Sequence, residues 1–303
     1  MNTLVIGIYD RTIRFLEINS QREITLAKSV DIPFSFSECF KFGNYDDTFI
    51  SEACSLIKDS LKNLNYSSYK ILLLLDTSYS FLNVVPLDID DSESNINTYI
   101  LWDISNYYPD SYKNFKINYY KLNEYKFASG IKATLIAAIE NSKLEIIRKI
   151  FHNCRMQINL LDLDHFAADK YANNIFVDNT YTNEIISIGC KRNRVDISIT
   201  GQKGIRYYNF IHFKDVNYQD KLLKLFSNLK KEIYLNQIKL AMVYGEDYTE
   251  DVCKFLSKKF SYINFKMPNP FEAFPINDKK QIEKKLKTEG NKFVPLFGLF
   301  LKG

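Results

Sequence analysis

Residues 3–32, TLVIGIYDRTIRFLEINSQREITLAKSVDI, decide the fold of this chain. Three apolar segments, Thr3–Tyr9, Thr12–Ile18 and Glu23–Ile32, are separated by short polar breaks, which predicts three consecutive strands. Residues 184–213, EIISIGCKRNRVDISITGQKGIRYYNFIHF, repeat the same pattern. A strand triplet that occurs twice indicates an internal duplication. We therefore expect an α/β protein with two similar lobes that face each other across a cleft.

Each triplet is followed by an amphipathic helix and then by a short apolar run. The runs Lys70–Leu75 and Ile238–Tyr244 have the length and composition of buried parallel strands. The helices that precede them carry apolar residues at helical spacing, from Ile50 to Leu64 (with Asp47 or Thr48 as the cap) and from Leu222 to Ile233. A helix capped by Thr249, a strand at Tyr262–Met267, a proline-rich loop and a helix from Phe293 are predicted beyond them.

Residues 81–154 have the pattern of a self-contained insert. Phe81–Leu87, Asn114–Leu122 and Ile131–Ile139 are predicted strands, and Met156–Leu161 with a helix near His165–Asn173 returns the chain to the first lobe. Two helices belong to the insert, one capped by Ser92 and stopped by Pro109, the other opened by a capping box of Ser142 and Glu145. We expect these elements to form a small sheet with helices against it.

The chain is therefore divided as follows: 1–80 first lobe, 81–154 inserted subdomain, 155–180 return of the first lobe, 181–292 second lobe, and 293–303 a C-terminal helix that packs back on the first lobe.

Composition excludes several classes of protein. The 303 residues carry a net charge of only +4 with no concentrated basic stripe, so we expect no nucleic-acid partner. Five widely spaced cysteines without a C-x-x-C pair fit a reducing cytosol rather than a disulfide framework or a zinc cluster. No apolar run has the length of a membrane span, and Leu4–Ile8 is too short for a signal peptide, so we expect a cytoplasmic protein that does not insert directly into the membrane.

Several stretches resemble, in order along the chain, the PilM family of actin-like type IV pilus assembly proteins. WDISNYYP at 102–109 resembles the family's W-E-x-x-x-Y-I-P, and INYYKL at 117–122 resembles its next strand. Residues 132–151 are similar to the strand and helix that follow in the family. Asn269-Pro270-Phe271 falls where the family has N-P-F, and the last eleven residues are similar to its A-x-G-L-A-L-R-G tail. The resemblance implies a two-lobed, ribonuclease H-like actin fold with an inserted subdomain in the first lobe.

The resemblance also implies a role as a platform at the inner membrane. A PilM-like protein binds the cytosolic N-terminal tail of a membrane partner, PilN in that system. Extended peptides dock through main-chain hydrogen bonds and apolar pockets, and we expect such a groove near Trp102, Tyr107, Ile117 and Tyr119. The chain would then be cytoplasmic and held at the inner membrane through its partner; self-association stays open.

Actin-like folds bind ATP with Mg²⁺ between the lobes, and the first strand turn of the family reads D-x-G-S-S-S-x-K. Here the stretch is GIYDRTIR at 7–14, so Gly7 replaces the metal-binding acid and Tyr9 replaces the turn glycine. Thr12 and Arg14 are sensible matches to Ser and Lys. Asp10 has a suitable carboxylate, but a structural role in the hairpin turn is the simpler interpretation.

The second turn of the family reads D-I-G-x-S-x-T, and here it is SIGCKRN at 187–193. Gly189 is retained, while Ser187 replaces the acid. Lys191 and Arg192 have the charge to hold phosphates, but two bases at an exposed turn are more simply solvated. The base-binding turn is reduced to Tyr244-Gly245-Glu246-Asp247. Without the acidic ligand, Mg²⁺ loses its anchor, so we expect no catalytic residue and no ATP hydrolysis, and nucleotide binding at Gly7, Asp10, Thr12, Ser187, Gly189 and Gly245 stays open.

Three alternatives accompany this interpretation. An active ATPase or small-molecule kinase of the same superfamily is the rival from a different class. A GspL-like type II secretion component and an FtsA-like division protein share the fold, but GspL normally continues into a membrane span and FtsA into an amphipathic helix. No metal site is expected: His165 with Asp162 and Asp164 is better explained by aspartates that cap a helix.

Overall fold

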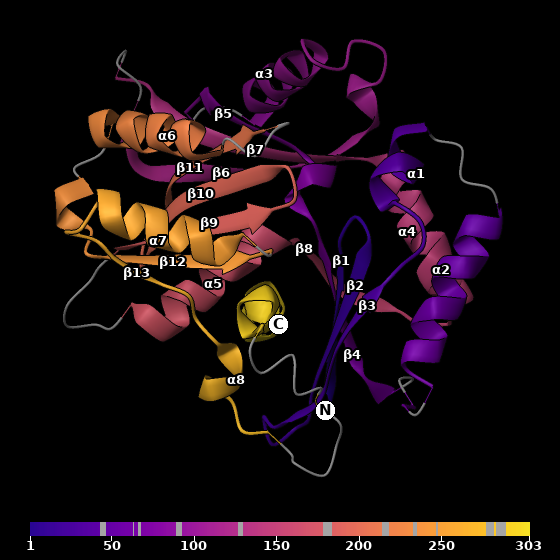
Figure 1. Cartoon of the computed structure of the whole chain (residues 1–303). Coiled ribbons are helices and arrows are strands. Elements are labelled where there is room, and N and C mark those ends of the chain that lie inside the picture. The colour runs from indigo at the N-terminus through magenta and orange to yellow at the C-terminus, as the bar shows by residue number, and fades with distance from the viewer. Residues whose placement is uncertain are drawn as a thin grey trace.

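The computed structural model describes residues 1–303 except 43–46, 63, 66–67, 89–92, 127–129, 178–183, 214–217, 233–234, 247, 277–281 and 283–288. Two five-stranded sheets with the same strand order form its frame (Figure 1). The first has the order β3-β2-β1-β4-β8, and its strands are β1 (Thr3–Ile8), β2 (Thr12–Ile18), β3 (Ile24–Asp31), β4 (Lys70–Leu75) and β8 (Ile158–Leu163). The second has the order β11-β10-β9-β12-β13, and its strands are β9 (Glu184–Lys191), β10 (Arg194–Gly201), β11 (Gly204–His212), β12 (Leu240–Gly245) and β13 (Asn264–Lys266).

The duplication extends to the strand pairing. In both sheets the triplet is antiparallel, and its first strand also pairs in parallel with the strand that follows the next helix, β1 with β4 and β9 with β12. These central strands are buried along their length because both faces of each sheet are covered. The predicted two-lobed arrangement is confirmed.

Helices cover the outer face of each sheet (Figure 1). On the first lobe these are α1 (Phe36–Phe42), α2 (Asp47–Ser60) and α4 (Asn141–Asn153), which share one core cluster with Phe15 and Leu73. On the second lobe α6 (Tyr218–Glu232) and α7 (Thr249–Lys259) cover Ile188 and Val243. Apolar residues at helical spacing on one face of each helix explain this packing.

Two helices lie between the sheets. The C-terminal helix α9 (Val294–Lys302), yellow in Figure 1, packs along α5 (Asp164–Phe176), and both join residues of the two sheets in one core cluster. The helices approach so closely at Gly298 that a Cβ there would lie 1.8 Å from the carbonyl oxygen of Ala167. Only glycine allows this contact.

The insert is a three-stranded antiparallel sheet of order β5-β7-β6, with β5 (Phe81–Pro86), β6 (Phe115–Lys126) and β7 (Lys132–Glu140). Helix α3 (Glu93–Ser105) covers one face through Ile96, Ile100 and Ile104. Strand β6 also lies beside β11 of the second lobe (Figure 1), where Tyr120 and Tyr208 both contact Phe166. The insert therefore touches both lobes.

Several local predictions were wrong. Ser142 lies inside α4, whose cap is Glu140 and has no side-chain cap hydrogen bond, so the capping box does not form. Thr249 is the first residue of α7 rather than its cap, and its hydroxyl donates to the carbonyl of Glu246. The strand predicted at 262–267 is limited to β13, and the proline-rich loop contains the short helix α8 (Pro270–Ala273), capped by Asn269. Helix α1 was not predicted, and the Ser92 cap lies outside the described residues.

In the portion of the chain that the structure describes, no helix combines the length and the apolar character that a membrane crossing requires.

Candidate functional site: the cleft between the lobes

Charged residues follow three strands at the edge where the two sheets face each other. Asp76 comes directly after β4, Asp164 directly after β8, and Lys191 is the last residue of β9. Asp196 lies on β10 beside them. Because the carboxyl ends of parallel strands meet at one edge of a sheet, these side chains from distant parts of the sequence converge in the cleft.

Lys191 is the centre of this group. Its Nζ lies 2.6 Å from Oδ1 of Asp164, 3.1 Å from Oδ1 of Asp76 and 3.3 Å from Oδ2 of Asp196. It also donates a hydrogen bond to the hydroxyl of Thr77. The Lys191 side chain is only 9% exposed, so the interpretation of this lysine as a solvated base was wrong. The hairpin turn begins one residue later, and the side chain of Arg192 is 69% exposed.

The charges hold one another ionised. Burial by itself would lower the pKa of Lys191, but Asp164, Asp76 and Asp196 raise it well above its usual range. Burial would likewise raise the pKa of Asp196, but Lys191 and Arg194 hold it well below its usual range. For Asp164 burial is the stronger effect and raises the pKa to about 6, although Lys191 opposes it. The group is thus a compact set of buried charges with carboxylates in excess of its central cation.

A second polar chain crosses the interface below this group. Nδ1 of His165 lies 2.7 Å from the hydroxyl of Tyr244, and Nε2 lies 3.0 Å from Oγ of Ser198. Ser198 in turn donates to Asp169 over 2.6 Å. Burial lowers the pKa of His165 to about 3, so the imidazole is neutral at pH 7. The predicted capping role of Asp164 was wrong: its carboxylate accepts from the backbone N–H of Thr77, and the helix has no side-chain cap.

Another contact joins the lobes through Arg14 of the first lobe and Glu246 of the second. Arg14 on β2 forms an ion pair of 2.8 Å with Glu246, which follows β12, and donates to the carbonyl of Lys292. Its guanidinium also lies 4.4 Å from the centre of the Tyr9 ring. Tyr9 is buried, and its ring occupies the space beside Gly7, where a Cβ would lie 2.9 Å from it.

The residues predicted for the first nucleotide turn contact neighbouring segments of the first lobe, and Asp10 also forms a 3.5 Å ion pair with the exposed Arg192 of the second lobe. Asp10 accepts hydrogen bonds from the hydroxyl of Ser35 and the backbone N–H of Ser37, so it fixes the start of α1. Thr12 donates to the carboxylate of Asp31 on the neighbouring strand. Gly7 lies within β1, opposite Arg14.

The residues predicted for the second turn and the base-binding turn serve protein packing. A Cβ on Gly189 would lie 2.6 Å from the hydroxyl of Tyr244 and 3.0 Å from Nδ1 of His165. Gly245 has a φ of +124°, and a Cβ there would lie 2.0 Å from the carbonyl oxygen of Cys190. Ser187 is fully buried in β9. Gly245 therefore allows a close approach of β9 within the second lobe, and Gly189 makes room for Tyr244 of the same lobe and for His165 of α5. Asp247 lies outside the described residues.

The four residues predicted for partner binding fall into two pairs. Trp102 and Tyr107, at the end of α3 and just beyond it, are 58% and 61% exposed. Their rings contact Tyr99 and Phe81, respectively. Ile117 and Tyr119 are half-buried on β6 and pack in the cluster that α3 covers. Trp102 and Tyr107 are thus at the surface, and Ile117 and Tyr119 pack against α3, the helix that carries Trp102.

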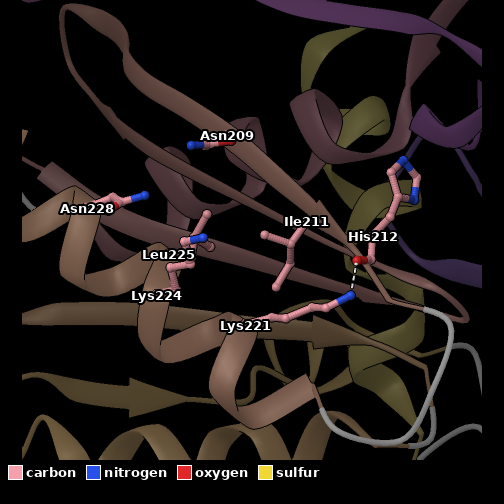
Figure 2. Close-up of a pocket in the computed structure, with 7 residues that line it drawn as sticks. All are labelled: Asn209, Ile211, His212, Lys221, Lys224, Leu225 and Asn228. Atoms are coloured by element: carbon pink, nitrogen blue, oxygen red, sulfur yellow. Dashed lines mark hydrogen bonds between the residues drawn. The ribbon is translucent and has the colours of Figure 1, made fainter.

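Two further features of the described residues concern ligand binding. Among the described residues, no group of three or more His, Cys, Asp or Glu side chains is arranged to hold a metal ion. A pocket of about 340 Å³ lies between β11 and α6, lined by Ile211, Lys221, Leu225 and their neighbours (Figure 2). Lys221 crosses it and donates to the carbonyl oxygen of His212 over 2.8 Å.

The two lobes of equal strand order, the helix pair between them and the cleft at the strand ends define the actin-like fold. The chain resembles the solved structure described as a PilM-PilN type IV pilus biogenesis complex, with a TM-score of 0.71 and 12% identity over 99% of this chain and 98% of that one. Its fold is that of PilM, as the sequence motifs predicted.

Two other solved structures are more distant. The ethanolamine utilization protein EutJ from Carboxydothermus hydrogenoformans matches with a TM-score of 0.50 and 7% identity, over 100% of this chain and 90% of that one. The cytoplasmic domain of EpsL, an inner membrane component of the type II secretion system of Vibrio cholerae, matches with a TM-score of 0.47 and 8% identity, over 100% and 96% of the two chains. No family model and no curated protein matches the sequence.

Proposed function

We propose that this chain is a PilM-like cytoplasmic component of a type IV pilus or a related secretion machine, and that it binds the cytosolic N-terminal tail of a PilN-like inner-membrane protein. The likeness to the PilM-PilN structure over 99% of the chain supports this proposal, because it includes the insert as well as the two lobes. The chain would be held at the membrane through that partner.

We propose further that it acts as a scaffold and does not hydrolyse ATP. The observation that supports this proposal is that side chains fill the cleft. Tyr9 and Lys191 belong to the two turns that were predicted to bind phosphate, and both are buried where these turns face the other lobe. A triphosphate would have to displace Lys191, which is ion-paired with three carboxylates. Asp196 would keep Arg194 as its partner, whereas Asp76 and Asp164 would repel the phosphates.

The exposed aromatic pair on the insert is the best candidate for the docking surface. Trp102 and Tyr107 combine large apolar area with a polar group, which is the chemistry that interfaces favour. The α3 helix that carries Trp102 is rigidly supported by Ile100 and Ile104, both fully buried, so the exposed rings are held in place before a partner binds.

The test is the binding of a fluorescent peptide with the sequence of the PilN-like protein's cytosolic tail, measured by anisotropy. The double substitution of Trp102→Ala and Tyr107→Ala is expected to weaken binding at least tenfold, because loss of interface aromatics of this kind costs roughly 2 kcal/mol or more. Tyr262→Ala, at an exposed tyrosine of the second lobe, is the matched control and should bind as the unchanged protein does. Equal affinity of all three proteins would show that the docking surface lies elsewhere, and no binding at all would contradict the proposed partner.

A further inference from the structure

A buried polar contact between the lobes is centred on a single cation. The group concerned, which we name the Lys191 latch, consists of Lys191, Asp76, Thr77, Asp164 and Asp196. Asp76, Thr77 and Asp164 come from the first lobe, in the segments after β4 and β8, whereas Lys191 and Asp196 come from the β9–β10 hairpin of the second. We propose that Lys191 is an internal counter-ion that holds the two lobes shut without any bound ligand.

The hydrogen bonds of the latch run in both directions across the interface. Lys191 donates from the second lobe to Asp76, Thr77 and Asp164 of the first. Thr77 donates back from the first lobe to Asp196 over 3.0 Å. All five side chains lie in the buried part of the cleft, where each bond is stronger than it would be in water.

The charge balance makes the latch depend on the lysine. Three carboxylates share two cations, because Arg194 pairs with Asp196 at 2.7 Å and Lys191 serves all three. Without Lys191, Asp76 and Asp164 would face Asp196 across the interface with no cation between these three carboxylates. Buried carboxylates that repel one another regain hydration only if the lobes separate, so removal of this one charge favours an open cleft.

An apolar contact between the lobes provides a natural hinge. Helices α5 and α9 belong to a core cluster that also contains Val5 of the first sheet and Met242 of the second. Helix α5 begins at Asp164 of the latch, but the apolar cluster involves later residues of the helix, from Ala167 onward, and would remain packed when the cleft opens. A rotation about it would expose the latch and leave both outer helix layers intact. This inference concerns the chain alone and stands whether or not the proposed pilus partner is correct.

Hydrogen exchange of the full-length chain, followed by mass spectrometry, tests the latch. Lys191→Met keeps most of the side-chain volume and removes the charge. We expect at least tenfold faster exchange in residues 76–80 and 189–196, with unchanged protection in α2 and α7 on the outer faces. Arg192→Met, one residue along, is the control: it removes an exposed base whose 3.5 Å ion pair with Asp10 of the first lobe lies at the surface, where such pairs contribute little, so it should exchange as the unchanged protein does.

A rescue experiment identifies the role of the charge. In Lys191→Ala, millimolar propylammonium should restore slow exchange in both segments, because a small alkylammonium ion can occupy the place of the lysine head group. Sodium chloride at the same ionic strength should not. Restoration by both salts would show that screening, rather than a cation seated between the carboxylates, closes the lobes, and would overturn the proposal.

Two other results would also overturn it. Protection of Lys191→Met equal to that of the unchanged protein would show that the lysine does not hold the lobes. If Lys191→Met instead loses protection everywhere, the double variant Asp164→Asn with Lys191→Met lowers the remaining buried charge. An open cleft with protected outer helices in this variant supports the latch, whereas a closed cleft, or global unfolding again, contradicts it.

Discussion

The two lobes share a strand order, and each has a carboxylate that forms an ion pair with a base of the other lobe. The two ion pairs differ in how deeply they are buried. Asp76 follows the central parallel strand β4 and meets Lys191 of the second lobe; Glu246 follows the equivalent strand β12 and meets Arg14 of the first. Lys191 and its three carboxylates are buried, whereas Glu246 remains one-third exposed. Among the described residues, the same architecture therefore supplies a buried joint at Lys191 and a peripheral joint at Arg14, beside the more exposed 3.5 Å pair of Asp10 with Arg192.

This difference shows how a duplicated frame becomes asymmetric. Each sheet brings the carboxyl ends of its parallel strands to the cleft, so the position of charged residues there follows from topology. Which charges face each other is set by only a few side chains at the strand ends. In this chain those side chains bind one another, and the cleft becomes part of the protein interior.

The largest expected effect separates the two joints directly. Lys191→Met should lower the free energy of unfolding by about 3–5 kcal/mol, because it leaves buried carboxylates without their cation. Arg14→Met should cost about 1–2 kcal/mol, because Glu246 can regain water when its partner is lost. Urea unfolding followed by circular dichroism measures both. Equal losses in the two variants would remove the distinction between a buried and a peripheral joint.

A somewhat smaller effect is expected at the helix pair that both lobes share. Gly298→Ala places a Cβ 1.8 Å from the carbonyl oxygen of Ala167, so α9 must shift away from α5, at a cost of about 2–3 kcal/mol. Gly130→Ala is the matched control: its Cβ meets no neighbour, and its φ of +81° alone should cost about 1 kcal/mol. A Gly298→Ala variant as stable as this control would show that the helices tolerate a wider separation.

The smallest effect is a pH dependence from the chain of hydrogen bonds below the latch. Burial raises the pKa of Asp169 to about 7, with Asp196 and Asp162 adding to the rise and the hydrogen bond from Ser198 opposing it. Because this pKa lies above the ordinary value near 4, the folded state binds the proton more tightly than the unfolded chain does. Stability should therefore increase as the pH falls from 8 to 6.5, by at most about 1.4 kcal/mol per pH unit.

Asp169→Asn should flatten this slope, which urea unfolding at pH 8, 7.25 and 6.5 measures. The comparison with Asp169→Asn isolates Asp169, because the other groups contribute to both curves: Asp164, with a pKa of about 6, acts in the same direction, and His165, with a pKa of about 3, acts in the opposite direction as the unfolded chain takes up a proton around pH 6.5. Parallel curves for the variant and the unchanged protein would show that Asp169 stays ionised in the folded state.

Much of the fold was predictable from local pattern. The strand triplets, the buried strands and the three strands of the insert follow from apolar periodicity, which tertiary packing reinforces. The second helix assigned to the insert, α4, packs instead in the core of the first lobe. Helix caps were predicted less well: Ser142 and Thr249 have the right chemistry near a helix start, but the chain enters each helix one or two residues earlier. Helix α1 is short, and its start depends on Asp10, which lies far away in sequence, so a local pattern could not reveal it.

The sequence predicted where the cleft lies but not which side chains occupy it. Lys191 and Arg192 are adjacent bases, and their sequence context does not show that the last strand position turns one inward and the turn directs the other outward. A signal was nevertheless present, since Asp76 and Asp164 each follow an apolar run of strand length. Acids at the ends of parallel strands converge, and a base at the end of a third strand is then their natural partner.

The central claim is that the chain's own side chains occupy the cleft between its lobes. A thermal melt of the unchanged protein with and without millimolar Mg-ATP tests it most directly, because a ligand that binds only the folded state raises the melting temperature. The account predicts no change in melting temperature. A saturable rise of several degrees that Gly189→Val abolishes, in a variant that melts as a folded protein, would contradict it and favour a nucleotide-binding enzyme.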